Sequence, residues 1–492
     1  MVLLRTYKKK LEGIKVTGIT QDSRQVSPGF CFVAIRGTAV DGHHFIGEAI
    51  KRGASMIVVE KGILIPVKIP DSIGVMAVEN TQIALGELSH AFYGYPAEKL
   101  TCIGATGTNG KTTITYLLES ILKTAGKIPG VLGTITYRWP GGSLQSSHTT
   151  PSAPELAQTI WQMRKDGGID TLVMEVSSHA IEQHRIEGID FDVGIFSNIT
   201  QDHLDYHGSM ENYISIKRKF FEYYLEKNPE SIAVFNMDDP SGLAFYQAHR
   251  GKKVSYGIRH HGADIQAIEW DSTLGGTQLV AHVFGRKVEI TSPLIGEFNI
   301  YNVLSVLAAG WALGLALDDI IMGISNLKGV PGRMERVERG QNFHVFVDYS
   351  HTPDSLEKAL ITLRNLKPNR IITVFGCGGD RDREKRPLMG GIAARLSDYV
   401  IITSDNPRSE DPATIAHAAE QGVTKEGAQK DTHYSVILDR HEAINEAINK
   451  AQAEDVVLIA GKGHENYQVL GHSTIDFDDK KVAREALRKK AF

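Results

Sequence analysis

The stretch that decides the fold is LTCIGATGTNGKTTITYLLESILKT, residues 100–124. Its first part is apolar, as in a buried strand, and its last part places Ile114, Leu117 and Ile121 on one helix face. Between them lies the glycine-rich turn GATGTNGKTT, residues 104–113. A strand, a glycine-rich turn and a helix in this order are the context that a phosphate-binding loop requires.

The turn has the chemistry needed to hold a nucleoside triphosphate. Glycines let backbone N–H groups point at phosphate oxygens, Lys111 reaches the β- and γ-phosphates, and the Thr112 hydroxyl is a ligand for Mg²⁺. The general pattern begins with glycine, whereas Ala105 stands at that position here. An ordinary glycine-rich turn is the alternative interpretation. The motif alone leaves a motor, a kinase, a GTPase and a ligase open.

Segments on both sides of this stretch predict an α/β protein of several domains. Residues 1–99 contain the short β-rich pieces CFVAI, MIVVE and GVMAV, and TLVMEV, DVGIF and IAVFN then alternate with helical patterns. Such alternation favours a mainly parallel sheet covered by helices. After the turn Val330-Pro331-Gly332, four more strands each end in a polar or glycine-rich loop, where α/β proteins bind ligands. The predicted domains are 1–99, 100–330 and 331–492.

Composition narrows the class of protein. A chain of 492 residues is too long to fold around one ordinary hydrophobic core, so several domains are expected. A net charge of -4 gives no general attraction to nucleic acid. Three cysteines without metal-ligand spacing suit a reducing cytoplasm. The start MVLLRTYKKKLEG lacks the apolar segment of an export signal. The uncharged stretch 298–317 contains asparagines and glycines, so we expect a buried helix and no membrane span.

Two further polar groups follow apolar strands. Glu175 ends the segment TLVMEV, where a carboxylate must find partners or hold a cation; a capping or salt-bridged glutamate is the alternative. After DVGIF comes NITQDHLDYHG, residues 198–208, with potential metal ligands, although Mg²⁺ prefers oxygen to the imidazole of His203. Lys217 lies on the next predicted helix, where a solvated cation is the ordinary expectation. It shares a helix face with Tyr213, four residues earlier.

Six motifs together resemble the Mur ligase family. They are GATGTNGKTT, MEVSSHAIEQHR, SNITQDHLDYHG, GEFNIYN, DYSHTPDSL and GCGGDRDREKRP, and they follow in the family's order over nearly the whole chain. The resemblance implies an N-terminal α/β domain that holds the UDP end of a substrate, a central P-loop ATPase domain, and a C-terminal Rossmann-like domain that brings an amino acid. It also implies ATP and Mg²⁺ as cofactors, small-molecule substrates, and a monomer.

The resemblance assigns roles to individual residues. Lys217 matches a family lysine that is carbamylated, so that a cation becomes an anion able to help place Mg²⁺, and Lys111, Lys217, Glu175 and His203 become the catalytic group. Ser23 would contact uridine, beside the loop Thr38-Ala39-Val40. The implied sets are Gly107, Thr108, Asn109, Gly110, Lys111, Thr112, Thr113, Asn299, Asn302, Arg333 and Asp348 for ATP, Thr112, Glu175 and His203 for Mg²⁺, and Thr149, Thr150, Ser177, Gln183 and Arg185 for a muramoyl dipeptide.

The loop SDNPR, residues 404–408, carries the expected choice of amino acid. Diaminopimelate differs from lysine by a second carboxylate, and Arg408 offers a planar fork that fits one. A surface arginine is the ordinary alternative, but DNPR resembles the signature of the diaminopimelate-adding members. The implied contacts are Arg381, Asp405, Asn406, Pro407, Arg408, Gly461 and Glu465, the last for the distal ammonium.

The expected reaction forms an amide through an acyl phosphate. The γ-carboxylate of a D-glutamyl residue attacks ATP, and the amine of diaminopimelate then displaces phosphate. A lysine-adding member of the family is the nearest alternative, and a folylpolyglutamate or D-Ala-D-Ala-adding relative would lack DNPR. A P-loop motor or switch would hydrolyse ATP without an amino acid. The cluster GCGG, residues 376–379, also permits a weak dinucleotide-loop interpretation.

Overall fold

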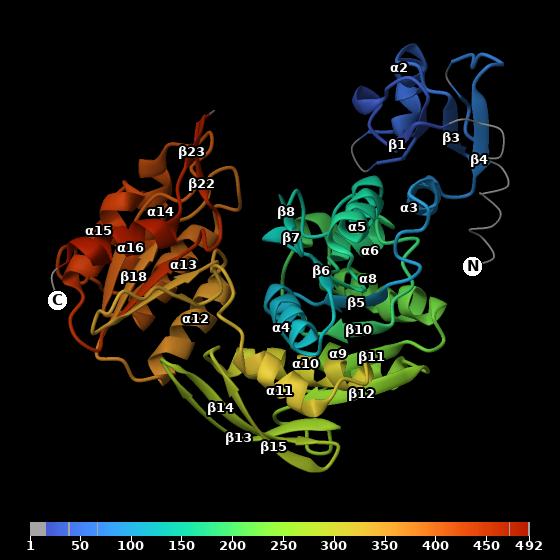
Figure 1. The fold of residues 1–492 in the computed structure, drawn as a ribbon. Coiled ribbons are helices and arrows are strands. Elements are labelled where there is room, and N and C mark those ends of the chain that lie inside the picture. The colour runs from blue at the N-terminus through green and yellow to red at the C-terminus, as the bar shows by residue number, and fades with distance from the viewer. Residues whose placement is uncertain (1–15, 38–39, 66, 472, 491–492) are drawn as a thin grey trace. The chain divides into compact units, whose positions relative to one another are not determined.

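The computed structural model describes residues 16–37, 40–65, 67–471 and 473–490 (Figure 1). Two compact units divide the chain. The first contains the described residues up to Ala267 with His282–Lys287 and Tyr301–Ile324, and the second contains Ile268–Ala281, Val288–Ile300 and the described residues from Ser325 onward. The start MVLLRTYKKKLEG and the loop residues Thr38 and Ala39, for which predictions were made, lie outside the described residues.

The N-terminal segment of the first unit is a four-stranded parallel sheet. Its strands are β1 (Gly18–Thr20), β2 (Phe30–Val33), β3 (Met56–Glu60) and β4 (Gly74–Val78), in that order. The apolar pieces predicted as strands are therefore β2, β3 and β4. Alternate residues of β2 and β3 enter two small cores, one completed by α2 (Ile46–Lys51) and the other by α3 (Thr81–Phe92).

The central sheet of the first unit has the order β12-β11-β10-β5-β9-β6-β7-β8, parallel from β12 to β6. Ile114, Leu117 and Ile121, predicted to share one face of the helix after β5, are all buried, which confirms that helix face. The strands are β5 (Thr101–Thr106), β6 (Pro129–Leu132), β7 (Thr136–Trp139), β8 (Gly142–Gln145), β9 (Thr171–Glu175), β10 (Val193–Phe196), β11 (Ile232–Asn236) and β12 (Lys252–Gly257). The helices are α4 (Lys111–Thr124), α5 (Ala153–Gly167), α6 (Ser178–Glu182), α7 (Leu204–His207), α8 (Met210–Lys219) and α9 (Pro240–Ala248).

Strand register brings three polar segments to one edge of this sheet. Ala105 of β5 pairs with Glu175 at the end of β9, and Thr106 pairs with Phe196 at the end of β10. The glycine-rich turn, Glu175 and the loop after β10 therefore leave the sheet side by side. This is the carboxyl edge, where ligands bind in open α/β sheets.

The uncharged stretch predicted as a buried helix is α10 (Glu297–Ala312), followed by α11 (Leu317–Ser325). Residues 303, 304, 306, 307, 308 and 309 of α10 are buried. Among the helices of the described residues, none is long and apolar enough to cross a membrane. Before α10 come three long strands, β13 (Ile265–Thr273), β14 (Gly276–Val283) and β15 (Arg286–Ser292), with β14 in the middle.

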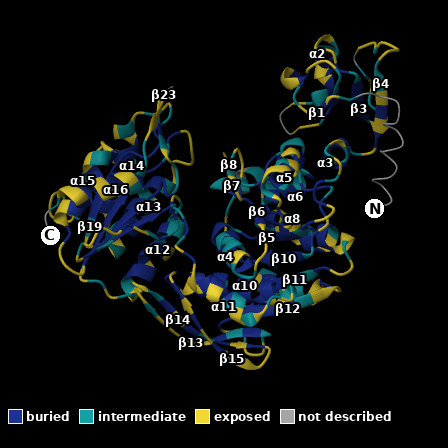
Figure 2. Ribbon diagram, viewed as in Figure 1, coloured by how far each residue is buried: buried dark blue, intermediate teal, exposed yellow. Residues whose placement is uncertain are grey.

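The C-terminal part of the second unit is a sheet with helices on both faces. Its order is β16-β17-β21-β18-β19-β20, parallel except for β16. Its four inner strands, β17, β21, β18 and β19, are mostly buried (Figure 2), and separate cores lie on the two faces, one with α12–α14 and one with α15 and α16. The bounds are β16 (Glu335–Arg336), β17 (His344–Asp348), β18 (Ile371–Phe375), β19 (Tyr399–Ile402), β20 (Tyr434–Val436), β21 (Val456–Ala460), α12 (Pro353–Asn365), α13 (Lys385–Leu396), α14 (Pro412–Lys425), α15 (Arg440–Lys450) and α16 (Asp479–Lys489), with the hairpin β22 (Tyr467–Leu470) and β23 (Ser473–Asp476).

Candidate active site

The glycine-rich turn wraps the N-terminus of α4 as a phosphate loop does. Gly107 and Gly110 have φ of 147° and 90°, values that favour glycine. A Cβ on Gly107 would lie 1.9 Å from Ser197 Oγ, and one on Gly110 would lie 2.4 Å from Asn302 Oδ1. Lys111 Nζ donates to the carbonyl oxygens of Gly107 and Thr108, each at 2.8 Å, so its ammonium lies over the loop. The geometry suits an anion at a helix N-terminus.

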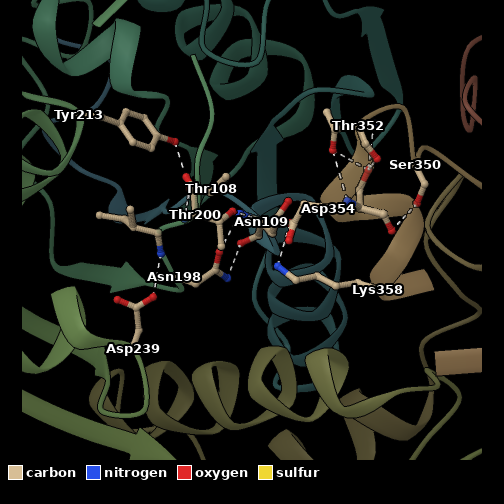
Figure 3. Close-up of polar contacts among 12 residues, drawn as sticks. Thr108, Asn109, Asn198, Thr200, Tyr213, Asp239, Ser350, Thr352, Asp354 and Lys358 are labelled. Atoms are coloured by element: carbon tan, nitrogen blue, oxygen red, sulfur yellow. Dashed lines mark hydrogen bonds and ion pairs between the residues drawn. The ribbon is translucent and has the colours of Figure 1, made fainter. Parts of the chain in front are cut away.

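The loop after β10 fixes the phosphate loop from one side (Figure 3). Thr108 N donates to Asn198 O at 2.7 Å, and Asn109 N donates to Asn198 Oδ1 at 3.1 Å. The Thr108 hydroxyl donates to Thr200 O at 3.2 Å and lies 3.2 Å from the Tyr213 hydroxyl. The sequence prediction treated residues 198–208 as possible metal ligands and missed this supporting role. Its signal was the position of these polar residues directly after a buried strand.

Glu175 is buried and holds the hydroxyl that was predicted to bind Mg²⁺. It accepts hydrogen bonds from Thr112 Oγ1 at 3.1 Å, Thr134 N at 2.9 Å and Thr134 Oγ1 at 3.0 Å. Thr134 was missed because it lies in no recognisable motif. A carboxylate and a hydroxyl form an oxygen donor set of the kind that Mg²⁺ prefers, so the two residues fit the ion.

His203 is not part of that contact. Its side chain is about half exposed, its φ is 52°, and its Nε2 lies 3.4 Å from Asp202 Oδ2. Among the described residues, no group of three or more His, Cys, Asp or Glu side chains is placed to hold a metal ion. The role of His203 as a ligand stays a prediction.

Lys217 is buried, so the ordinary expectation of a solvated cation is wrong. Its side chain is 1% exposed, and Nζ donates to Gly107 O at 2.8 Å and lies 4.8 Å from the centre of the Tyr213 ring. Burial lowers the pKa of Lys217 well below its ordinary value, and the nearby charge of Lys111 lowers it further. The amine therefore meets the phosphate loop at Gly107, and its burial favours the neutral form over the charged one.

The residues predicted to hold a muramoyl dipeptide form one network beside Glu175. Thr150 Oγ1 donates to Glu175 O at 2.8 Å, and Ser177 N donates to Thr150 Oγ1 at 3.1 Å. Arg185 donates to Thr150 O at 2.9 Å and, through Nε and Nη2, to Gln183 Oε1 at 2.9 and 2.6 Å. The structure also joins Thr149 to this group, because its hydroxyl lies 3.0 Å from Thr134 Oγ1.

Ser23 lies apart from that network, in the N-terminal segment. Its hydroxyl is buried and donates to Glu48 Oε2 at 2.9 Å. The structure therefore brings together five of the six residues predicted to bind the UDP substrate. The sixth, Ser23, begins the short 3-10 helix Ser23–Gln25 in the N-terminal segment, and its contact with uridine stays a prediction.

In the second unit, Arg333 and Asp348 are close in space. Asp348 is buried and accepts from Met334 N at 2.6 Å and Ser350 N at 2.9 Å, and the Arg333 guanidinium lies 4.6 Å from the Tyr349 ring centre. Burial raises the pKa of Asp348, which these hydrogen bonds and the Arg333 charge oppose. Asn299, also predicted to contact ATP, donates to Ile295 O at 2.9 Å.

The residues predicted to bind diaminopimelate meet at the carboxyl edge of the C-terminal sheet. Asn406 Nδ2 donates to Glu465 Oε2 at 2.9 Å, and Lys462 Nζ lies between them, 3.2 Å from Glu465 Oε2 and 3.3 Å from Asn406 Oδ1. Lys462 is fully buried and was missed, although it lies between the predicted contacts Gly461 and Glu465. A Cβ on Gly461 would lie 2.6 Å from Asp405 Oδ2, so glycine is needed there.

Arg408, the residue expected to choose the amino acid, is half-buried, with φ of 52°. Its Nη1 donates to Gly379 O at 2.8 Å. A Cβ built on Gly378 would lie 2.9 Å from Arg408 Nη1 and 3.8 Å from Arg381 Cγ, so the two arginines lie beside the same glycine. Pro407 packs its carbonyl against Gly379. Arg408 is therefore part of a formed loop.

Fold and site define an α/β protein whose central parallel sheet carries a P-loop. Three family models match the chain, "Mur ligase family, catalytic domain" at residues 15–93, "Mur ligase middle domain" at 105–310, and "Mur ligase, glutamate ligase domain" at 332–463. The chain belongs to the Mur ligase family.

Named relatives are similar over almost the full chain. A UDP-N-acetylmuramoyl-L-alanyl-D-glutamate--2,6-diaminopimelate ligase from Geobacillus thermodenitrificans is 44% identical over 479 residues, 96% of this chain and 95% of that protein. A protein of the same name from Solibacter usitatus is 44% identical over 487 residues, 99% and 96% of the two chains. A solved structure titled with this ligase name has a TM-score of 0.68 and 33% identity, and covers 96% of this chain and 95% of its own.

Proposed function

We propose that this protein is an ATP-dependent ligase that joins meso-diaminopimelate to the D-glutamyl γ-carboxylate of UDP-N-acetylmuramoyl-L-Ala-D-Glu. The product is a precursor of peptidoglycan. The named relatives support this proposal because they are similar to the chain from end to end. We further propose that it acts as a cytoplasmic monomer on small molecules, with domain boundaries near residues 99 and 330.

The guanidinium of Arg408 carries the choice of amino acid. Among the described residues, only Gly379 O accepts a hydrogen bond from this group, and no carboxylate lies within ion-pair distance of it. A half-buried guanidinium with open N–H groups fits a carboxylate that a ligand supplies. Glu465, on the neighbouring loop after β21, and Asn406, two residues before Arg408, offer oxygen acceptors for an ammonium. This pair of sites suits an amino acid whose distal end carries both a carboxylate and an ammonium. Lysine has the distal ammonium but lacks the distal carboxylate.

The first chemical step is phosphoryl transfer. A γ-carboxylate oxygen of the D-glutamyl residue attacks the γ-phosphorus of ATP, the bond to the β-phosphate oxygen breaks, and an acyl phosphate and ADP result. Lys111 and the loop N–H groups stabilise charge on the phosphoryl oxygens, and Arg333 adds a second cation in this proposal. Thr112 and Glu175 would hold Mg²⁺, which supplies further charge stabilisation on the phosphates.

The second step forms the amide. The amine of the L-centre attacks the acyl-phosphate carbonyl, a tetrahedral intermediate collapses with loss of phosphate, and the amine loses its proton. The network of Thr150, Ser177 and Arg185 is proposed to hold the dipeptide so that its γ-carboxylate reaches the phosphate loop. Positioning of this kind supplies a large part of the rate in reactions between two bound substrates.

Lys217 is proposed to be carbamylated. Its neutral amine attacks CO₂, an N–C bond forms, and a proton is released, which leaves a carbamate with a negative charge. A neutral amine is the reactive form, and the burial of Lys217 beside Lys111 lowers its pKa and so favours that form. The carbamate would help to place Mg²⁺ beside Gly107.

Phosphate release tests the function. Purified enzyme with ATP, Mg²⁺ and the UDP-dipeptide should release phosphate only when diaminopimelate is added, and lysine should replace it poorly. Arg408→Ala should raise the KM for diaminopimelate about a hundredfold while the KM for ATP stays within twofold, because one charge-assisted bidentate contact is lost. Arg395→Ala, an exposed arginine on α13, is the matched control. Release without any amino acid, or equal use of lysine, would contradict the proposal.

A further inference from the structure

Two loops meet where the C-terminal sheet would bind the amino acid. The glycine loop, residues 376–380, follows β18, and the arginine loop, residues 405–410, follows β19. The strands are parallel neighbours, with Phe375 paired to Ile402. The two loops therefore leave the sheet side by side, and what holds them together controls where Arg408 lies.

The glycines of GCGG are explained by this contact and not by a dinucleotide. A Cβ on Gly376 would lie 2.4 Å from Thr403 O, and one on Gly379 would lie 1.9 Å from Pro407 O. At Gly378 a Cβ would come within 2.9 Å of Arg408 Nη1. A side chain at 376 or 379 would push the backbone of the arginine loop away, and one at 378 would displace the Arg408 guanidinium. The glycine loop thus forms the surface against which the arginine loop packs.

An ion pair between a buried arginine and a half-buried glutamate fastens the end of the arginine loop. Arg386, on α13 and only 2% exposed, donates to Glu410 through Nη2 at 2.9 Å and Nη1 at 3.1 Å. The same carboxylate accepts from Asp380 N at 2.6 Å, so Glu410 joins the helix, the glycine loop and the arginine loop. The Arg386 guanidinium and the backbone N–H of Asp380 lower the pKa of Glu410 to about 2, which keeps it ionised at all working pH values.

A second clamp lies one residue nearer to Arg408. The Asp380 carboxylate accepts from Ser409 Oγ at 2.6 Å and from Ser409 N at 3.1 Å. On the other side, β22 holds the backbone of Arg408, because Arg408 N donates to Val469 O at 3.2 Å and Gly471 N donates to Arg408 O at 2.8 Å. With φ of 52°, Arg408 has a backbone conformation that non-glycine residues adopt only when their surroundings impose it.

We propose that Glu410, Arg386, Asp380 and Ser409 are positioning residues that hold the Arg408 guanidinium in place for the second carboxylate of the amino acid. This inference rests on the proposed function. None of the four needs to touch the substrate. They act through Arg408, so their loss should affect the amino acid selectively and leave the nucleotide side of the reaction unchanged.

Kinetics of Glu410→Gln test this proposal. The amide keeps the shape but loses the ion pair, so we expect the KM for diaminopimelate to rise about tenfold, with the KM for ATP and for the UDP-dipeptide within twofold of wild type. The preference for diaminopimelate over lysine should fall by a similar factor. Glu410→Asp should recover part of the loss. The control is Glu426→Gln, which breaks the comparable but more exposed pair with Arg395 on α13.

Ser409→Ala provides a second test if Glu410→Gln does not fold. It removes one hydroxyl donor from Asp380 and should raise the same KM severalfold with an unchanged melting temperature. A folded Glu410→Gln or Ser409→Ala enzyme with a wild-type KM for diaminopimelate would overturn the positioning role while the proposed function stands. Wild-type enzyme that uses lysine as well as diaminopimelate would overturn both. The two failures are therefore distinguishable.

Discussion

Glu87 is the carboxyl group whose removal makes the clearest prediction about stability. It lies on α3 with 7% of its surface exposed, and its Oε2 has no hydrogen-bond partner among the described residues. The chain of Glu187 runs close by, since a Cβ on Gly86 would lie 2.5 Å from Glu187 Cβ. Burial, and then the Glu187 charge, raise the pKa of Glu87 to about 7, against a smaller opposing effect of Lys227.

The direction of this pKa shift decides how the stability of the protein changes with pH. A carboxyl group whose folded-state pKa lies above its unfolded value favours the folded state when protonated, and this advantage is lost as the pH rises from 4.5 through about 7. A pKa of about 7 in place of 4.5 corresponds to at most about 3 kcal/mol. Relaxation of the protein around the buried charge, together with its attraction to Lys227, reduces the expected difference to about 1–2 kcal/mol.

Glu87→Gln removes the titration and keeps the side-chain volume. At pH 8 the variant should be about 1–2 kcal/mol more stable than wild type, a rise in Tm of about 2–4 °C, and at pH 4.5 the difference should vanish. Thermal and urea unfolding at both pH values measure it. Glu98→Gln, at an exposed glutamate eleven residues further along the chain, should show no such pH dependence. An equal stability change at pH 4.5 and pH 8 would refute the reasoning.

Two other predictions concern buried cations. Arg440 and Asp479 form a fully buried ion pair at 2.7 Å, so Arg440→Leu should lower the free energy of unfolding in urea by about 3–5 kcal/mol. The double variant Arg440→Leu with Asp479→Leu should recover most of this loss. A double variant as unstable as the single one would contradict the prediction. Wild-type protein in ¹³C-labelled bicarbonate should show a carbamate ¹³C signal that Lys217→Met lacks, and identical spectra would exclude carbamylation of this lysine.

The phosphate loop could be predicted because its whole chemistry is local. Gly107, Gly110, Lys111 and Thr112 lie within six residues, and the strand and helix around them have clear periodicity. The strand ends were predictable for a similar reason, since Glu175 directly follows an apolar run and parallel strands bring their carboxyl ends to one edge. Local pattern and the rule for parallel sheets were enough to place this side of the site.

The rest depends on contacts between segments far apart in the chain. Thr134 binds Glu175 across 41 residues, and nothing in its own neighbourhood marks it. Lys217 follows a polar helical pattern like that of its exposed neighbours, and only the docking of α8 against the phosphate loop buries it. The glycines of GCGG are conspicuous in the sequence, but they are needed because a loop about thirty residues later packs against them.

The buried basic side chains Arg440, Arg386 and Lys217 show how the surroundings of such a group determine its chemistry. A guanidinium cannot lose its proton inside a protein, so Arg440 and Arg386 are each held by a carboxylate, Asp479 and Glu410. Among the described residues, the only acceptor of the Lys217 amine is the carbonyl of Gly107. Without a paired carboxylate, a buried lysine becomes neutral, and a neutral amine is a nucleophile. A carboxylate in contact with Lys217 would stabilise the charged ammonium and end that reactivity. The proposed carbamylation therefore depends on Lys217 contacting a carbonyl oxygen and no carboxylate.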